Sequence, residues 1–430
     1  MDSSRVQRRC VFYFAGFDPS GPAHYHRMYQ QEAALQAQVS GYDMEVGPRR
    51  KTGEHLASWS VTHTSKNEDS PTTTHTNYVY ARWDDIVRRH WYKLDFSSSS
   101  WQFLVAFLAT QWMYLRTGAT KRMLQLSWPP VVAALSHALI LVLVISLGIA
   151  APWLTWSIAK YFFGFAHLSL PVRVIAALLC AVPSYLAIIW TVRKLEEKFY
   201  ILWLIRGYLF TRQQALEQTP ELDERLIYFS KIIYQALESG EYDEVLVVGH
   251  SLGTVLAVEV AALSLMEREM HAKKKQFEGL VDSKEPRTSF SLLTLAQLIP
   301  LLSSLPQATS FRECLKQLSF TKNFHWIDIS APPDGCCFVL VDAIEAAVPV
   351  EECGHYRAKL LSPRFQTLFN AAQYQALRKR RLDLHFQYIK SAPLAGEYDY
   401  FSISAGPSHL HTRFQNSASI TDFKTFKTFS

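Results

Sequence analysis

A single serine, Ser251, occupies the centre of a Gly-His-Ser-Leu-Gly string that follows the apolar run 245–248. A serine hydroxyl is a weak nucleophile until a base removes its proton, and a sharp strand-to-helix turn exposes it to base and ester together. Gly249 and Gly253 lack the Cβ atoms that would crowd such a turn. Because residues 254–266 have the composition of a helix, the string predicts a nucleophilic serine rather than a helix-capping one.

A nucleophilic serine needs a carboxylate that orients its base. Residues 324–329 read as a late strand, and the loop beyond it carries Asp334 before a glycine. The Gly-His-Ser-Leu-Gly string resembles the nucleophile elbow of α/β-hydrolases, a family that places its acid on the loop just beyond a late strand. The resemblance thus implies Asp334 as the acid, although an aspartate before a glycine is also a common turn residue. Asp328, inside the strand, and Asp342, after the next apolar run, stay open as alternatives.

The base must be a histidine on a loop at the same edge of the sheet. Four histidines follow the acid in the chain, namely His355, His385, His409 and His411. His385, which follows the basic helix predicted at 374–381, is the predicted base. His355 is the alternative.

The Gly-His-Ser-Leu-Gly string, with its strand and helix, resembles the nucleophile elbow of α/β-hydrolases, especially lipases and esterases. The His-x-x-Tyr stretch that begins at His385 resembles the start of the last helix in many hydrolases of this class. The chain is also similar to bacterial proteins that combine such a domain with transmembrane helices. The resemblance implies an α/β fold of the α/β-hydrolase type, with a mostly parallel sheet, helices on both faces and a triad in the order Ser, acid, His.

The resemblance also implies an oxyanion hole built partly by a loop after an early strand. The backbone N–H of Leu252 is one donor by its position after Ser251. The second comes from the loop 15–21, where Phe17 and Gly16 are the two candidates. This loop lacks the HGGG pattern of many esterases, so the choice between the two stays open.

Hydrophobic periodicity predicts the elements that must hold these residues. The predicted strands are 10–15, 42–46, 77–82, 245–248, 290–295, 324–329 and 398–403. The predicted helices are 25–39, 221–238 and 254–266, with a further helix starting at Asp84. Residues 51–76, rich in Thr, Ser, His and Asn, read as a loop or a ragged hairpin.

The middle of the chain is unusually apolar: residues 123–159 contain no Asp, Glu, Lys or Arg. Segments 131–151 and 174–192 are each long enough to cross a hydrocarbon core of about 30 Å, so we expect a transmembrane helical hairpin. Basic residues flank both ends and predict that the catalytic domain faces the cytoplasm. The expected organisation is a first α/β segment at 1–100, a membrane insertion at 101–210, a second α/β segment at 211–407 and a flexible tail at 408–430.

The composition limits the class of protein further. A net charge of +6 over 430 residues, without a long basic run, argues against a nucleic-acid partner. The six cysteines show no CxxC spacing, and no metal-ligand or phosphate-binding motif occurs, so we expect no cofactor. No secretory signal peptide is visible. The sequence predicts no oligomeric state.

The predicted function is therefore hydrolysis of a lipid-like or other hydrophobic ester through an acyl-enzyme on Ser251. Membrane lipid is the expected source of that substrate, because a membrane insertion would hold the triad beside the bilayer. Acyl transfer by the same triad and an inactive membrane scaffold of the same fold are the alternatives.

Overall fold

The computed structural model describes residues 5–66, 71–91, 98–163, 201–278 and 288–420, and scattered positions between 169 and 194. Its strands are β1 (Arg8–Phe14), β2 (Asp43–Val46), β3 (Arg50–Lys51), β4 (Leu56–Ser65), β5 (Thr72–Ala81), β6 (Glu244–His250), β7 (Ser289–Leu295), β8 (Phe324–Ile329) and β9 (Lys359–Leu361).

The α-helices lie between and after these strands in the sequence. They are α1 (Pro22–Ser40), α2 (Asp84–Arg89), α3 (Ser98–Arg116), α4 (Ala119–Leu126), α5 (Trp128–Phe163), α7 (Ile201–Ala215), α8 (Pro220–Glu238), α9 (Gly253–Phe277), α10 (Ile299–Ser303), α11 (Thr309–Phe320), α12 (Ala371–Lys379), α13 (Arg381–Phe386), α14 (Tyr400–Ala405) and α15 (Leu410–Arg413). Three short 3₁₀ turns, η2 (Val350–Glu352), η3 (Phe365–Thr367) and η4 (Gln387–Ile389), complete the described elements.

The nine strands form one mixed sheet in the order β2-β4-β5-β1-β6-β7-β8-β9, with β3 beside β4. Every pair from β5 through β1 to β9 is parallel, whereas β2, β3 and β5 run antiparallel to β4. The central strand β6 is buried along its whole length. Its apolar sequence is typical of a strand that is covered on both faces. The protein is therefore an α/β fold with a mostly parallel sheet.

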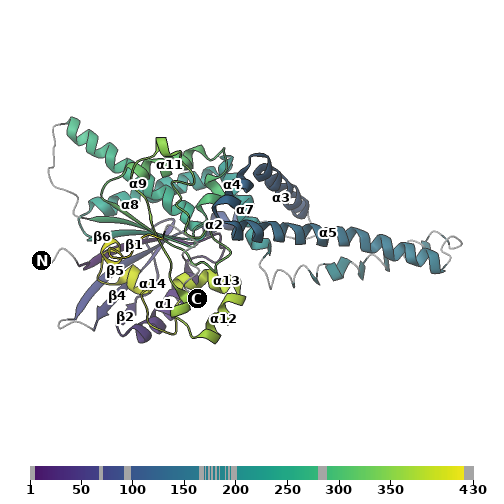
Figure 1. Cartoon of the computed structure of the whole chain (residues 1–430), viewed down its shortest axis with the longest axis horizontal. Helices are drawn as coiled ribbons and strands as arrows, with labels where there is room; N and C mark the ends of the chain where they lie inside the picture. Colours follow the sequence, from purple (N-terminus) through teal and green to yellow (C-terminus); the bar gives the residue numbers. More distant parts are fainter. Residues whose placement is uncertain are drawn as a thin grey trace. The chain divides into compact units, whose positions relative to one another are not determined.

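Helices cover both faces of this sheet (Figure 1). On one face α9 packs against β1, β6 and β7, and α8 and α11 pack against α9. On the other face α14 packs against β4 and β5, and α1 contacts β2. This layering places the ends of β1, β6 and β8 at one edge, where the catalytic residues were predicted.

Of the two structures predicted for residues 51–76, a loop or a ragged hairpin, the hairpin is found: β4 pairs antiparallel with β5, and inward Trp59 and Val61 are buried, whereas Ser60 between them is exposed. The predicted strand 398–403 is wrong, because Asp399 accepts hydrogen bonds from the N–H groups of Phe401 and Ser402 and so caps the helix α14.

The predicted flexible tail at 408–430 is ordered as far as residue 420. The buried Arg9 guanidinium pairs with Glu244 and donates to the carbonyl oxygens of Gly406 and Ser408. Glu244 in turn accepts from the backbone N–H of Leu410, whose side chain is buried. A buried ion pair at the amino edge of the sheet therefore fixes this segment, and residues 421–430 lie outside the described part.

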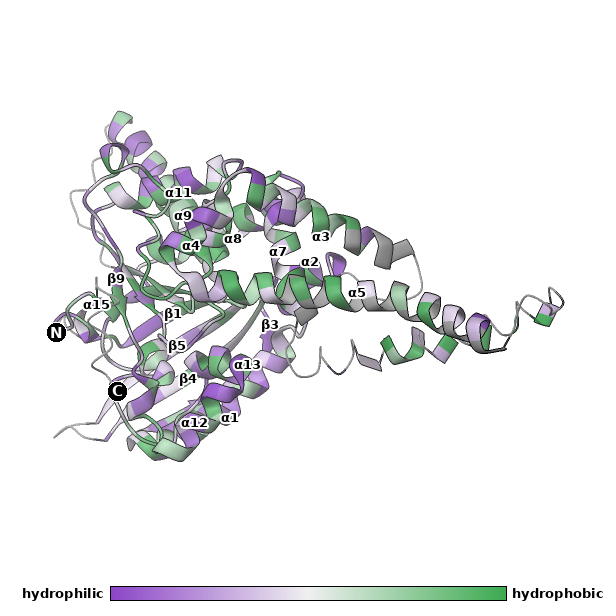
Figure 2. Cartoon of the chain, turned by 45° about the vertical axis from the view of Figure 1, so that its right-hand side comes forward, coloured by the Kyte–Doolittle hydropathy of each residue, from purple (hydrophilic) through white to green (hydrophobic). Residues whose placement is uncertain are grey.

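Internal contacts divide the chain into two units, Met1–Pro130 with Tyr208–Ser430, and Val131–Gly207. The predicted span 131–151 falls within the 36-residue helix α5, in which hydrophobic turns alternate with less hydrophobic ones (Figure 2). The predicted span 174–192 lies largely outside the described residues. Among the residues that were placed, no helix is both long and apolar enough to cross a membrane, so the predicted transmembrane hairpin is not found there.

Candidate active site

Ser251 lies in a sharp turn between β6 and α9. Its φ of 57° is in the left-handed region that non-glycine residues rarely adopt. Its N–H donates to the Leu295 carbonyl oxygen over 2.9 Å, which ties the turn to the end of β7. The side chain is half-buried, so its hydroxyl is within reach of a substrate. A strained serine at a strand-to-helix turn is the geometry that exposes a nucleophile.

The two glycines of the string are required by close packing. A Cβ on Gly249 would lie 2.7 Å from the Cβ of Ala257 on α9. A Cβ on Gly253 would run into the carbonyl oxygens of Phe14 and Ala15 at the end of β1. Both glycines therefore let α9 approach the sheet closely and keep the turn tight.

We expect Gly253→Ala to lower the free energy of unfolding by about 1 to 3 kcal/mol, because backbone atoms of β1 must move to admit the methyl group. Chemical denaturation of the purified chain measures this. Gly335→Ala is the matched control, since an added Cβ there meets no described atom within 4 Å. Equal stability of the two variants would contradict the packing role of Gly253.

The loop after β1 lies directly against the nucleophile. A Cβ on Gly16 would be 3.0 Å from the Ser251 Cβ and 3.4 Å from its Oγ. The Leu252 N–H bonds to no carbonyl oxygen among the described residues, and it lies at the start of α9. The predicted oxyanion donors, Leu252 on one side and the 16–17 segment on the other, therefore flank Ser251. Which of Gly16 and Phe17 donates stays a prediction.

An aromatic wall begins one residue beyond Gly16. The Phe17 ring lies 6.0 Å from the Trp83 ring and 5.0 Å from the Phe210 ring, centroid to centroid. Trp83 Nε1 donates to the Ala15 carbonyl oxygen over 3.0 Å, which anchors the wall to the end of β1. All three rings are buried, so the cluster packs behind the loop and holds residues 16 and 17 in place.

The predicted acid and base lie together although 51 residues separate them. His385 Nδ1 is 2.9 Å from Asp334 Oδ2, and both side chains are buried. Burial by itself raises the pKa of Asp334, but the charge of His385 and the hydrogen bond from it outweigh burial and lower that pKa below its ordinary value. The Cys336 N–H donates to Asp334 Oδ1 over 2.9 Å. Asp334 is thus an ionised carboxylate that can hold the imidazole in one orientation.

Sequence reasoning gave no role to two residues that support this pair. Tyr388 donates its hydroxyl proton to Asp334 Oδ2 over 3.1 Å and accepts from the Ala331 N–H over 2.7 Å. His250 Nε2 is 2.8 Å from the His385 carbonyl oxygen, and the two imidazole rings lie 5.1 Å apart. The His-x-x-Tyr spacing contained the signal for Tyr388. Only the tertiary structure reveals the contact of His250.

His250 precedes Ser251 in the chain, so its contact with the His385 carbonyl oxygen brings the backbone of His385 close to the residue before Ser251. The Ser251 hydroxyl itself forms no hydrogen bond with the described residues, His385 included. Catalytic hydrogen bonds are often long without substrate and shorten in the complex. The structure therefore brings all three predicted catalytic residues to one edge of the sheet, with the Asp334–His385 bond already formed.

Burial, followed by the charge of His385, lowers the pKa of His250 to about 3. The unfolded chain then binds a proton at this histidine between pH 6.5 and 3 that the folded chain does not. We expect His250 to remove about 2 kcal/mol of stability as pH falls from 6.5 to 5, and nothing above pH 7. His250→Asn keeps a donor for the His385 carbonyl and should reduce the loss of unfolding free energy between pH 6.5 and pH 5. Chemical denaturation at these two pH values measures this pH dependence. An unchanged slope would contradict the assignment, and the exposed His355→Asn should keep the wild-type slope.

The alternative acids have other partners. Asp328 accepts from the Thr294 hydroxyl over 2.6 Å, and burial raises its pKa to about 7. Asp342 accepts from the N–H groups of Ile344 and Glu345 and lies 3.8 Å from the Arg357 guanidinium. Neither carboxylate bonds to His385, whereas Asp334 does.

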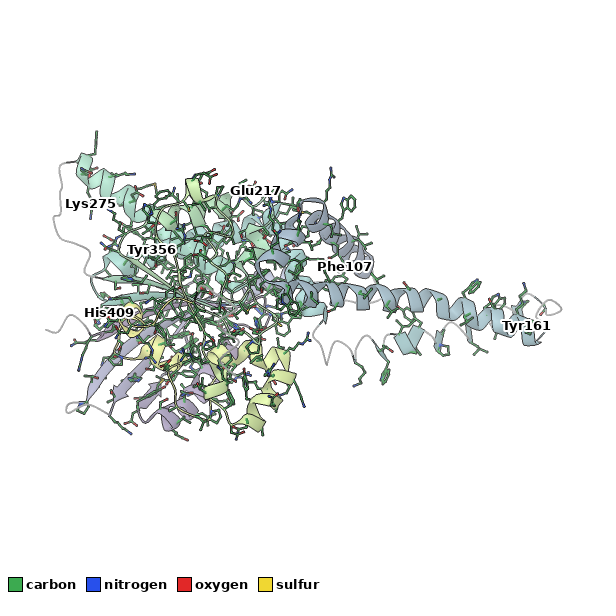
Figure 3. The ribbon with its side chains drawn as sticks, in the orientation of Figure 1. Phe107, Tyr161, Glu217, Lys275, Tyr356 and His409 are labelled. Carbon is green, nitrogen blue, oxygen red and sulfur yellow. The ribbon has the colours of Figure 1, made fainter. Side chains whose placement is uncertain are left out.

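The alternative bases lie elsewhere. His355 is exposed. His411 stacks on His325, the second residue of β8, with ring centroids 4.2 Å apart. His409, labelled in Figure 3, lies 5.4 Å from His411 between ring centroids. These last two histidines therefore lie at the amino edge of the sheet, opposite Ser251.

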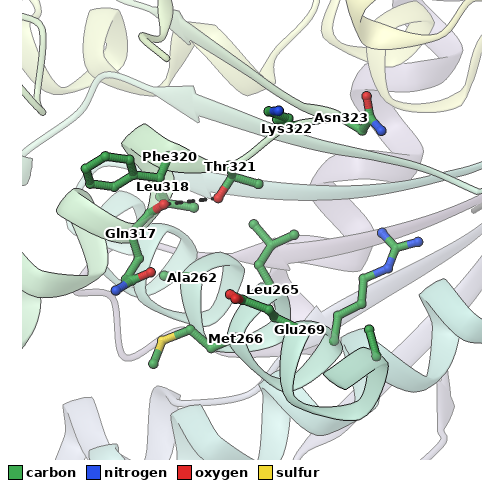
Figure 4. Close-up of a pocket in the computed structure, with 12 residues that line it drawn as sticks. Ala262, Leu265, Met266, Glu269, Gln317, Leu318, Phe320, Thr321, Lys322 and Asn323 are labelled. Carbon is green, nitrogen blue, oxygen red and sulfur yellow. Dashed lines mark hydrogen bonds between the residues drawn. The ribbon is translucent and has the colours of Figure 1, made fainter. Parts of the chain in front are cut away.

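A pocket of about 510 Å³ opens between α9 and α11 (Figure 4). It is lined by Ala262, Leu265, Met266, Arg268, Glu269, Ala272, Gln317, Leu318, Phe320, Thr321, Lys322 and Asn323. Asn323 directly precedes β8, so the pocket is at the amino edge of the sheet, whereas ligands of open α/β sheets bind at the carboxyl edge. We place the candidate active site at Ser251 rather than in this pocket.

Comparisons with protein families, curated proteins and solved structures gave no match for this chain. The chemical assignment of the site therefore depends on its own geometry.

Proposed function

We propose that the chain is a serine hydrolase of the α/β-hydrolase type that cleaves a hydrophobic ester through an acyl-enzyme on Ser251. One observation carries the proposal: the strained Ser251 turn and the bonded Asp334–His385 pair occur at the same edge of the sheet. These are the parts of a triad, in the chain order Ser, acid, His.

In the proposed reaction, His385 Nε2 takes the Ser251 proton while Oγ attacks the ester carbonyl carbon. Asp334 holds the proton on Nδ1 and stabilises the imidazolium. The Leu252 N–H and a donor from residues 16–17 bind the oxyanion. The imidazolium then protonates the departing alcohol, and water repeats the sequence on the acyl-enzyme to release the acid. The chain's own residues supply every proton transfer.

The test is a pre-steady-state assay with p-nitrophenyl esters of short and long acyl chains. We expect a burst of about one nitrophenolate per folded chain followed by slower turnover, because acylation precedes deacylation. The burst should be absent in Ser251→Ala. If product instead forms on an added alcohol, the same triad is an acyltransferase. A folded chain without burst or turnover would favour the inactive scaffold.

We also propose that the unit Val131–Gly207 holds the enzyme at a lipid surface, with the catalytic unit on the cytoplasmic side. Support comes from the uncharged stretch 123–159 and from exposed apolar side chains on α5, among them Leu139, Leu143 and Trp153. Large exposed apolar surfaces mark interaction sites.

Flotation with phosphatidylcholine vesicles tests this second proposal. The wild-type chain should float, and Leu139→Glu combined with Leu143→Glu should weaken its binding. Leu394→Glu, at an exposed leucine in the catalytic unit, is the matched control and should bind as the wild type does. Wild-type protein that stays with the soluble fraction would contradict membrane attachment.

A further inference from the structure

The loop that carries Asp334 also presents a thiol to the site. Ligand atoms of Asp334, Cys336 and His385 all lie within 4.8 Å of one another. Carboxylate oxygen, thiolate sulfur and imidazole nitrogen are the three donor types that bind zinc in proteins. Asp334 and His385 are buried, while Cys336 is half-buried. Two members of this cluster are the proposed acid and base, and the triad makes no use of the third.

We propose that Asp334, Cys336 and His385 form a regulatory zinc site whose occupation switches the enzyme off. Metal binding by these residues is independent of the proposed function, whereas the inhibition depends on it.

The chemistry of the cluster fits a divalent ion. Zinc would take the Asp334 carboxylate, the Cys336 thiolate and Nδ1 of a neutral His385, which faces Asp334 at 2.9 Å. The thiol proton goes to solvent, and the Nδ1 proton moves to Nε2. Two negative ligands then neutralise the ion, which favours a buried position.

The donors need only a small rearrangement. Tetrahedral zinc holds its ligand atoms about 3.5 Å apart, so the Cys336 sulfur must approach the other two donors by roughly 1 Å, while the Asp334 and His385 atoms, now 2.9 Å apart, separate slightly. Cys336 can supply this movement because it lies on a loop with no regular structure. Water takes the fourth position.

Zinc in this site disables the base. With Nδ1 on the metal, His385 carries its proton on Nε2 and cannot accept the proton of Ser251. The metal also takes the carboxylate that orients the imidazole. A chelator should restore activity, because zinc coordination is reversible and leaves Ser251 unmodified.

The neighbouring cysteines help to define the test. Cys337 is buried; its Sγ lies 3.6 Å from the Asp334 backbone oxygen and 3.9 Å from the Tyr388 hydroxyl, and it is not one of the three ligand atoms that lie together. Cys353 is partly exposed and contacts the Val350 carbonyl oxygen and the Arg357 guanidinium. Cys353→Ser is therefore the matched control for Cys336→Ser.

The experiment titrates the purified full chain with zinc chloride and measures bound metal by equilibrium dialysis. Cobalt(II) serves as a second probe, since a thiolate ligand gives a charge-transfer absorption band. We expect one zinc per chain, a thiolate band, and a burst that falls in proportion to occupancy and returns with EDTA. Cys336→Ser should weaken zinc binding at least about tenfold and lose the thiolate band, whereas Cys353→Ser should match the wild type.

The two proposals fail in different ways. Zinc affinity that is unchanged in Cys336→Ser, or no zinc binding at all, would overturn the metal site even if the chain hydrolyses esters. If the chain binds one zinc but shows no burst, the proposed hydrolase function is contradicted, whereas the proposed zinc site is retained. Zinc that raises the burst would overturn inhibition. Ser251→Ala should bind zinc as the wild type does, which separates binding from activity.

Discussion

Replacing His385 by alanine is expected to lower kcat/KM for a p-nitrophenyl ester by about 10⁴-fold or more, because no other group can take the Ser251 proton. The His385 backbone carbonyl contacts His250, the residue before Ser251, and His385 Nδ1 is held by Asp334. Steady-state kinetics on folded protein measure the loss.

The exposed His355 supplies the control for this prediction. His355→Ala should keep kcat/KM within about twofold of the wild type, as expected of a surface substitution away from the site. If His355→Ala were the inactive variant, or if His385→Ala kept a tenth of wild-type activity, His385 would not be the base.

The second large effect is expected from Asp334→Asn, which preserves shape but removes the charge. Without the carboxylate the imidazole loses the partner that fixes its tautomer and stabilises its protonated form, so kcat should fall by about 10⁴-fold. Asp342→Asn is the matched control, because Asp342 bonds to backbone N–H groups of its own turn. Similar kcat values for the two variants would mean that Asp334 has only a structural role.

Local sequence was sufficient to predict those elements whose structure is determined within one short segment. The run 245–248 followed by Gly-His-Ser-Leu-Gly predicted both β6 and the turn at Ser251, since burial and the two glycines act within a few residues. The strand at 324–329 coincides with β8, and the loop after it contains Asp334. Pairing that acid with His385 depended on the resemblance to known hydrolases, and the 2.9 Å bond agrees with it.

Sequence was insufficient where distant contacts decide the structure. The strand β4 is rich in Thr and Ser, which left a loop and a hairpin equally open, and its pairing with β5 decides for the hairpin. In α14, the side-chain cap of Asp399 outweighs the strand-like run of aromatic residues. The contact of His250 with His385 joins residues 135 positions apart in the chain, so no local pattern indicates it.

The most direct test of the central claim is labelling of the folded, purified chain with a fluorophosphonate, followed by peptide mass spectrometry. The probe reacts with a serine only when a base activates it. The proposed function predicts one adduct per chain, on Ser251, that is absent in Ser251→Ala and His385→Ala. An unlabelled folded chain, or an adduct on another residue, would contradict it.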